Sequence, residues 1–183
     1  MRKIFIFFLI GTVISSCSED ILPKPKAYLS LNYPAVTYKK VAVAKPYRFD
    51  VSSDVKIVEK PNFWRDIKYP KLKATINITY RPIENNLKEL LTEAEKLVYE
   101  HAVKAEEIIT KNFENFDNRV FGSMQEISGN AASHIQFHLT DSTRNFIKGT
   151  LYFYTKPNYD SILPAVDYIK KDITRLIETL EWK

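Results

Sequence analysis

The stretch RVFGSMQEISGNAASHIQFHLTDSTRNFIKGTLYFY, residues 119–154, decides the fold. It holds three runs in which apolar and polar residues alternate, as they do in half-buried strands. Between the runs lie two short segments of small and polar residues, which are typical of turns. A parallel crossover needs a dozen or more residues, so we expect the three strands to be antiparallel neighbours. The predicted strands are 119–127, 134–139 and 146–154.

Two more strands are predicted before this stretch. Residues 73–80 place Ala74, Ile76, Ile78 and Tyr80 on one face and polar residues on the other. Residues 47–51 alternate in the same way over a shorter distance.

Two segments have helical periodicity. Asn85 or Asn86 can cap the first helix, whose apolar residues form one stripe over about 25 residues. The second helix begins after 157–161. The stripe of the first helix comprises Leu87, Leu90, Leu91, Ala94, Leu97, Val98, Ala102, Ala105, Ile108 and Ile109. The inner face of the second comprises Val166, Ile169, Ile173, Leu176, Ile177 and Leu180.

The order of elements is strands, helix, three strands, helix. This order predicts an α+β domain with an antiparallel sheet of about five strands and two packed helices. The pattern does not show which face of the sheet the helices cover.

The N-terminus has the features of an export signal. Arg2 and Lys3 precede an apolar run of about 11 residues, which is too short to span a bilayer. Ile-Ser-Ser-Cys at 14–17 resembles the bacterial lipobox, in which the cysteine receives the lipid and becomes the new N-terminus. We therefore expect a signal peptide at 1–16, a lipidated tether at 17–26 and a single domain at 27–183. An ordinary signal peptide, or an uncleaved anchor, is the alternative.

Two further features bear on location and partners. Ser18, Glu19 and Asp20 resemble the signal that routes some lipoproteins of the Bacteroidota to the cell surface, and a merely polar tether is the alternative. We expect a lipid-anchored protein of the envelope, in the outer membrane on its periplasmic face or at the cell surface. The chain carries a net charge of +5, of which Arg2 and Lys3 contribute two. The remaining basic residues are spread among acids, which argues against a nucleic-acid partner.

The sequence does not point to catalysis or to a cofactor. It lacks a glycine-rich phosphate loop, paired metal-binding cysteines, HExxH and GxSxG. His134 and His138 share a predicted strand face, but no third metal ligand lies nearby. His138, Asp141 and Ser142 could form a catalytic triad, although Asp-Ser is also typical of a turn. We predict no enzyme, no metal and no cofactor.

Aromatic residues and one loop are the candidates for partner binding. Trp64 and Tyr69 fit either the core or an interface. The small residues at 128–133 permit the close approach of another backbone, or simply make a tight turn. The predicted partner-binding residues are Gly129, Asn130, Ala131, Ala132, Ser133, Asp141 and Ser142.

Several short segments follow one another along the chain: PKPKAYL at 23–29, YP at 33–34, YPK at 69–71, KATI at 73–76, GNAAS at 129–133, QF at 136–137, LTDS at 139–142, Gly149 with LYF at 151–153, PN at 157–158, DS at 160–161 and ETLEW at 178–182. Taken in this order, and together with the lipobox, they resemble the family of gliding motility lipoproteins GldD. The resemblance extends over nearly the whole chain after Cys17. It implies an envelope lipoprotein that is needed for Bacteroidota gliding, in an apparatus coupled to type IX secretion. It implies other gliding or secretion envelope proteins as partners and no known catalytic activity.

Three functions remain open from the sequence. The first is a non-enzymatic component or assembly factor of the motility apparatus. The second is a lipoprotein that binds a small ligand between sheet and helix, which requires a cavity of several hundred Å³. The third is a lipid-anchored hydrolase that uses His138, Asp141 and Ser142.

Overall fold

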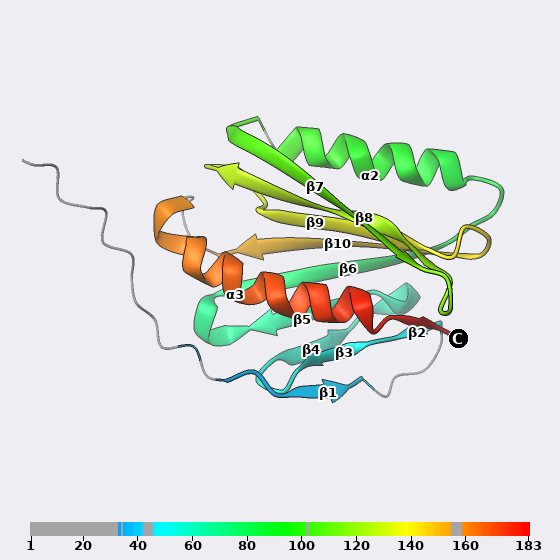
Figure 1. Cartoon of the computed structure of the whole chain (residues 1–183), viewed down its shortest axis with the longest axis horizontal. Helices are drawn as coiled ribbons and strands as arrows, with labels where there is room; N and C mark the ends of the chain where they lie inside the picture. The colour runs from blue at the N-terminus through cyan, green and yellow to red at the C-terminus, as the bar shows by residue number, and fades with distance from the viewer. Residues whose placement is uncertain (1–32, 34, 42–45, 102, 155–158) are drawn as a thin grey trace, which may run out of the picture.

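The three strands predicted within residues 119–154 lie in the middle of a larger sheet (Figure 1). The computed structural model describes residues 33, 35–41, 46–101, 103–154 and 159–183. The predicted signal peptide, the lipidation site and the whole predicted tether at 17–26 lie outside these residues. The strands of the main sheet are β4 (Lys56–Glu59), β5 (Arg65–Tyr69), β6 (Ala74–Pro82), β7 (Ala105–Asn115), β8 (Val120–Gly129), β9 (Ile135–Thr140) and β10 (Asn145–Phe153).

The prediction of antiparallel neighbours is confirmed, but the predicted number of strands is wrong. β8 pairs with β9 and β9 with β10, all antiparallel, and β10 then pairs with β6. The sheet has seven strands, not about five, in the order β4-β5-β6-β10-β9-β8-β7. The strands that the sequence did not reveal are the two outermost at one side, β4 and β5, and β7 at the other.

β7 takes the place of the second half of the long predicted helix. Helix α2 spans Leu87–His101, so Ile108 and Ile109 belong to a strand. Ala105 and Ile108 have the spacing of the predicted helical stripe, although they belong to the strand. The β-branched residues Ile108, Ile109 and Thr110 favour a strand, and an edge strand with little burial lacks the alternation that would reveal it.

β5 was hidden by a buried arginine. Arg65, Ile67 and Tyr69 all face the core. In the sequence, an arginine at this position indicates a solvent-exposed residue, so the apolar side of the strand was not recognised. Its guanidinium lies 4.3 Å from the centre of the Tyr47 ring, and its Nε donates to Glu59 Oε1 at 3.0 Å. Aromatic stacking and a carboxylate partner thus make its burial tolerable.

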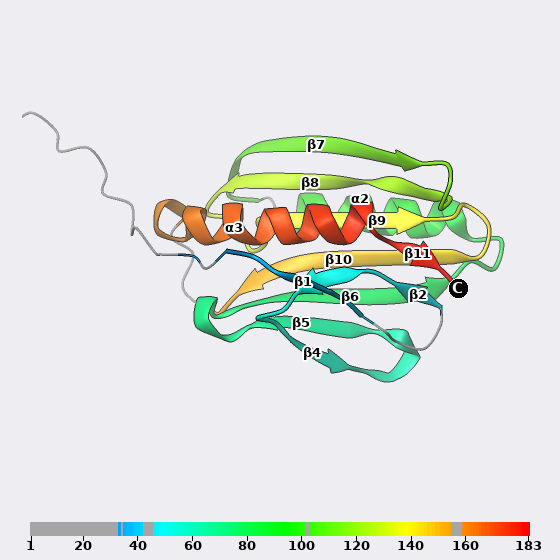
Figure 2. The ribbon, with the colours of Figure 1, turned by 60° about the horizontal axis from the view of Figure 1, so that its bottom comes forward.

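Helices cover both faces of the sheet (Figure 2). Helix α3 spans Tyr159–Glu178, and every residue of its predicted inner face is buried. In β10, Ile147 and Leu151 belong to the main core with α3, whereas Phe146 packs against Leu90 of α2. Alternate residues of a strand point to opposite faces, so α2 and α3 lie on opposite sides of the sheet.

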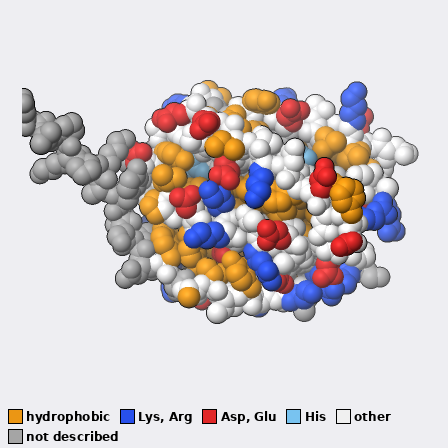
Figure 3. Space-filling model, in the orientation of Figure 1, with side chains coloured by type: hydrophobic (Ala, Val, Ile, Leu, Met, Phe, Trp, Pro, Cys, Tyr) orange, Lys and Arg blue, Asp and Glu red, His pale blue; other side chains and the backbone are white. Residues whose placement is uncertain are grey.

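Two small sheets complete the layer that contains α3. The predicted strand at 47–51 is extended but divided: β2 (Tyr47–Arg48) pairs with β11 (Glu181–Trp182), and β3 (Asp50–Ser52) pairs with β1 (Tyr38–Lys40). Tyr47, Phe49 and Val51 enter the main core beside α3. On the side of the molecule seen in Figure 3, basic and acidic side chains are interspersed.

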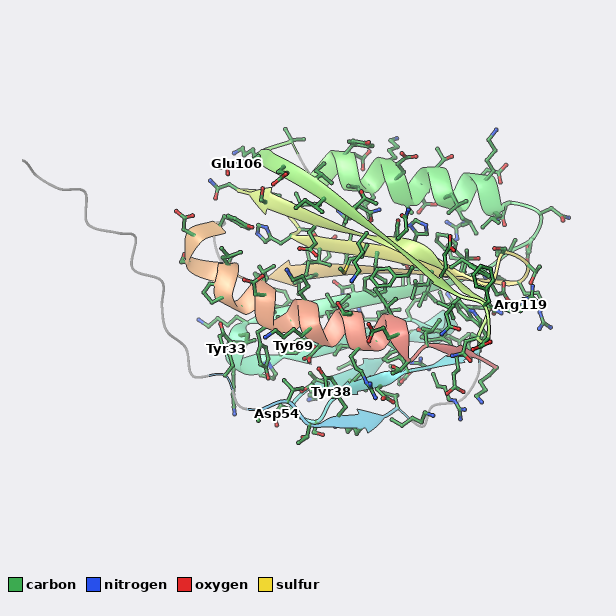
Figure 4. All side chains as sticks on the ribbon, in the orientation of Figure 1. Tyr33, Tyr38, Asp54, Tyr69, Glu106 and Arg119 are labelled. Carbon is green, nitrogen blue, oxygen red and sulfur yellow. The ribbon has the colours of Figure 1, made fainter. Side chains whose placement is uncertain are left out.

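The domain has two distinguishable ends, which we name after Tyr33 and Pro82. The Tyr33 ring stacks on Tyr168 in the first half of α3, with ring centres 4.5 Å apart. β6 begins at this end, beside the short helical turn η2 (Pro70–Leu72), and finishes at Pro82. Figure 4 shows Tyr33 and Arg119 at opposite ends of the molecule. No helix in the part of the chain that the structure describes is long and apolar enough to cross a membrane.

Candidate functional site

The loop at 128–133 is largely occupied by contacts within the chain. Gly129 has a φ of 83°, and a Cβ atom there would lie 2.9 Å from the Glu106 nitrogen. The close backbone approach expected at this loop is therefore made by the start of β7. Ser133 is buried and donates to the Leu151 carbonyl oxygen at 3.0 Å. Ala131 packs beside α2, while Asn130 and Ala132 are exposed.

Asp141 holds together the turn between β9 and β10. Its Oδ1 accepts the N–H groups of Thr143, Arg144 and Asn145 at 2.9, 2.7 and 2.9 Å, and Oδ2 accepts Asn145 Nδ2 at 2.7 Å. Burial alone would raise the pKa of the Asp141 carboxyl, but these hydrogen bonds lower it to about 2. Ser142 is exposed, with a φ of 64°. The turn lies at the opposite end of β9 from the 128–133 loop, so the predicted partner-binding residues form two separate surfaces.

The histidines do not join Asp141 and Ser142 in a hydrogen-bonded chain. The His138 ring faces Ser123, whose Oγ lies 3.5 Å from Nδ1, and Asp141 is engaged in its own turn. His134 instead bonds the Ile127 carbonyl through Nδ1 at 3.1 Å. Burial lowers the pKa of both histidines. Among the described residues, no group of three metal-ligating side chains comes together.

The Pro82 end carries a groove that the sequence did not reveal as a site. It has a volume of about 580 Å³ and lies between the end of β6, β10, α2 and the helical turn η1 (Pro61–Phe63). We call it the aromatic groove. Its lining residues are Asn62, Phe63, Trp64, Thr79, Tyr80, Arg81, Pro82, Leu90, Glu93, Phe146 and Lys148.

Two large aromatic residues border the aromatic groove and stay partly in solvent. Phe63 is 48% exposed and Trp64 39% exposed. Both are held in place: Trp64 Nε1 donates to the Tyr80 carbonyl at 3.0 Å, and the Phe63 carbonyl accepts from the Tyr47 hydroxyl at 2.7 Å. A half-exposed aromatic pair fixed in position is typical of an interface anchor.

The backbone at this border is strained. Asn62 and Phe63 have φ values of 59° and 61°, in the left-handed region. Asparagine tolerates this region, whereas a bulky residue such as phenylalanine is found there only when its surroundings enforce it. The edge-on contact of Phe63 with the Tyr80 ring, at 5.9 Å between centres, is one such constraint. Strain of this kind concentrates at binding sites and active sites.

Three charged side chains lie along the aromatic groove. Glu93 on α2 accepts from Arg81 at 2.6 Å and from Lys148 at 3.4 Å. Its partial burial would raise the pKa of the Glu93 carboxyl, but Lys148 and Arg81 outweigh this and lower it. With two cations to one carboxylate, the groove retains a net positive charge.

A second hollow lies between α2 and the sheet. It has a volume of about 440 Å³. Its lining is mostly apolar on the side of α2, where Glu95 is the charged exception, and polar on the side of β8 and β9. Ser123, Gln125 and His138 supply the polar part. We call it the α2 cleft.

The sequence contains one signal for the aromatic groove. Trp64 was identified as either a core residue or an interface anchor, and the structure exposes it while burying Tyr69. Phe63 was not predicted as a site residue, because the sequence Pro61-Asn62-Phe63 does not indicate that the phenylalanine adopts a left-handed backbone conformation.

Comparison with protein families identifies the family of the chain. The family model described as gliding motility lipoprotein GldD matches residues 18–182. A search of the curated proteins gives no match.

Proposed function

Because the chain belongs to the family of gliding motility lipoproteins GldD, we propose that it is a non-enzymatic component or assembly factor of the gliding apparatus and its type IX secretion system. A lipid on Cys17, after removal of residues 1–16, anchors it in the outer membrane, on the periplasmic face or at the cell surface. Residues 17–26 form the tether. The partners are other envelope proteins of the same apparatus.

The aromatic groove is the observation that carries this proposal. It combines a rigid aromatic border, an apolar floor and an excess of positive charge. These properties suit an extended or helical segment of a partner protein that carries a large apolar side chain next to a carboxylate. The two turns at 129–133 and 141–142 are proposed as secondary contact points.

The position of the groove also favours a partner over the membrane. Tyr33, which is closest to the tether among the described residues, packs on α3 at the other end of the domain. The groove lies at the Pro82 end and on the α2 face. Anchoring confines the domain to two dimensions, which raises its effective concentration near other envelope proteins and allows a modest interface to suffice.

The test is a pair of matched substitutions in the chromosomal gene. Phe63→Asn removes an aromatic anchor and places at φ 61° a residue that tolerates it. Phe116→Asn is the control, because Phe116 is 73% exposed and lies outside the groove. We expect Phe63→Asn to abolish colony spreading at a normal protein level, and Phe116→Asn to spread normally. Normal spreading of the Phe63→Asn strain, where a gene deletion does not spread, would contradict the proposal.

The lipid anchor has its own test. Labelling cells with radioactive palmitate should label the protein, and Cys17→Ser should remove both the label and the attachment to membranes. A native protein with an unmodified Cys17 and an intact leader would overturn this part of the proposal.

Binding of a small ligand is the second candidate, and the α2 cleft favours it. Its volume of about 440 Å³ is within the range of small-molecule sites. Gln125→Phe, which fills the cleft from β8, separates the two candidates. If Gln125→Phe stops spreading and Phe63→Asn does not, the protein binds a small ligand in the α2 cleft. If Phe63→Asn stops spreading and Gln125→Phe does not, it binds a partner in the aromatic groove.

A further inference from the structure

β7 is a long, open edge of the sheet. Among the described strands it pairs with β8 alone, and Figure 2 shows it along the outer margin of the sheet. It has 11 residues, whereas β4 at the opposite edge has 4. Proteins protect edge strands by keeping them short, bulged or charged. β7 carries charged side chains and has a bulge near its start, between Ala105 and Ile108. Beyond the bulge, none of the described strands pairs with its outer side.

The exposed side chains of β7 form a self-complementary pattern. Glu107, Ile109 and Lys111 alternate along the strand and so share the face on which α3 lies. Ile109 is 53% exposed. Within the described residues, neither Glu107 nor Lys111 has an oppositely charged partner. Read backwards, the order acid, apolar, base becomes base, apolar, acid, so an antiparallel copy places unlike charges opposite each other.

Symmetry restricts how two copies can pair. A two-fold axis perpendicular to the sheet reverses the strand but keeps each side chain on its own face of the sheet. Directly opposite residues of antiparallel strands also share a face, so one residue of β7 must lie opposite the same residue of the second copy, and the axis passes between the two. With the axis at Ile109, the two Ile109 side chains meet, and Glu107 of each copy faces Lys111 of the other.

The neighbouring axes give poorer pairs. With the axis at Thr110, Lys111 faces Ile109 and no unlike charges meet within the regular part of the strand. With the axis at Lys111, the two lysines face each other. Like charges opposite each other destabilise a strand pair. With the axis at Ile108, no unlike charges meet. We propose that β7 pairs with β7 of a second copy of this chain, antiparallel, about a two-fold axis at Ile109.

This dimer is a proposal separate from the aromatic groove, which lies on other elements. Pairing from Glu107 to Lys111 involves few residues, and Glu107 lies at the bulge, so the contact is weak in dilute solution. Anchoring two copies in one membrane would strengthen it by raising their local concentration.

Disulfide trapping in intact cells tests the pairing. Directly opposite residues of antiparallel strands have Cβ atoms about 5 Å apart, which permits a disulfide. Ile109→Cys in the full chain should therefore give a dimer on non-reducing gels after mild oxidation. Phe116→Cys is the control, because random collisions would link its more exposed side chain more readily. The unaltered chain, in which Cys17 is the single cysteine, shows how much dimer forms without the introduced cysteine.

Exchange of charges tests the register. In the Ile109→Cys background, Lys111→Glu should reduce the disulfide dimer by about tenfold, because it replaces two unlike pairs by two like pairs. Adding Glu107→Lys should restore it. Equal linking by Phe116→Cys, no linking by Ile109→Cys, or no effect of Lys111→Glu would each overturn the proposal. The amount of monomer in the envelope shows that each variant folds.

Discussion

Replacing Asp141 by asparagine should destabilise the protein by ~2 kcal/mol at neutral pH, although the substitution changes only one atom. The folded carboxyl has a pKa of about 2, compared with an ordinary value of 3.8. Each pKa unit corresponds to ~1.4 kcal/mol. Asparagine can keep the three backbone bonds to Oδ1 only by directing its own N–H₂ at Asn145 Nδ2, which is also a donor. Asn145 cannot turn its amide to relieve this, because its oxygen accepts the Tyr80 hydroxyl at 3.0 Å.

The effect has a defined pH dependence. The folded pKa is lowered, so the stabilisation is complete above the ordinary pKa and is lost as the pH falls through it toward 2. Urea unfolding at a series of pH values should therefore show a gap between the native protein and Asp141→Asn that is full at pH 7 and closes between about pH 4 and pH 2.

Ser142→Ala is the control for this prediction, because Ser142 belongs to the same turn but its exposed hydroxyl makes no hydrogen bond among the described residues. It should change the stability by less than ~0.5 kcal/mol. A gap between the native protein and Asp141→Asn that does not vary with pH, or an Asp141→Asn variant as stable as the native protein at pH 7, would refute the reasoning.

Three further predictions concern stability and can be measured by thermal or urea unfolding. Gly149→Ala should lower the free energy of unfolding by ~2–4 kcal/mol, because the added Cβ would lie 2.1 Å from the ring of Phe137. Asp172→Ala should lower the free energy of unfolding by ~2–3 kcal/mol, because the buried Tyr69 hydroxyl donates to Asp172 at 3.0 Å and would lose this acceptor. Asp172→Asn keeps an acceptor oxygen and should lower the free energy of unfolding by less. Lys73→Gly should stabilise by about 1 kcal/mol, because Lys73 has a φ of 49°.

The sequence predicted the parts of the fold in which period and burial agree. Alternation in β6, β9 and β10, and the inner stripe of α3, reflect faces that are buried in the structure. The elements that were missed break this relation. β5 buries an arginine, and β7 buries almost nothing, so neither shows the period of a half-buried strand.

The aromatic groove could not be predicted for a different reason. Its border and its floor come from four separate parts of the chain, η1, β6, α2 and β10, and only the fold brings them together. The loop residues that were predicted are explained mainly by local geometry: Gly129 by its positive φ and Asp141 by the turn that it organises. Small and polar residues in a turn do not by themselves distinguish a binding loop from a well-made connection.

The two proposed surfaces are compatible with one arrangement at a membrane. A two-fold axis perpendicular to the sheet points the strands of the two copies in opposite directions, so the Tyr33 ends lie far apart in the plane of the sheet. Both tethers reach the same bilayer over the shortest distance when this plane lies along it. Tyr33 packs on α3, so the α3 face is the one directed at the lipid, and the α2 face is directed away. The aromatic groove opens on the α2 side, between Glu93 and Lys148. Pairing through β7 would therefore present two grooves to partners beyond the membrane surface, and a partner with two binding segments would hold the dimer more tightly than either groove alone.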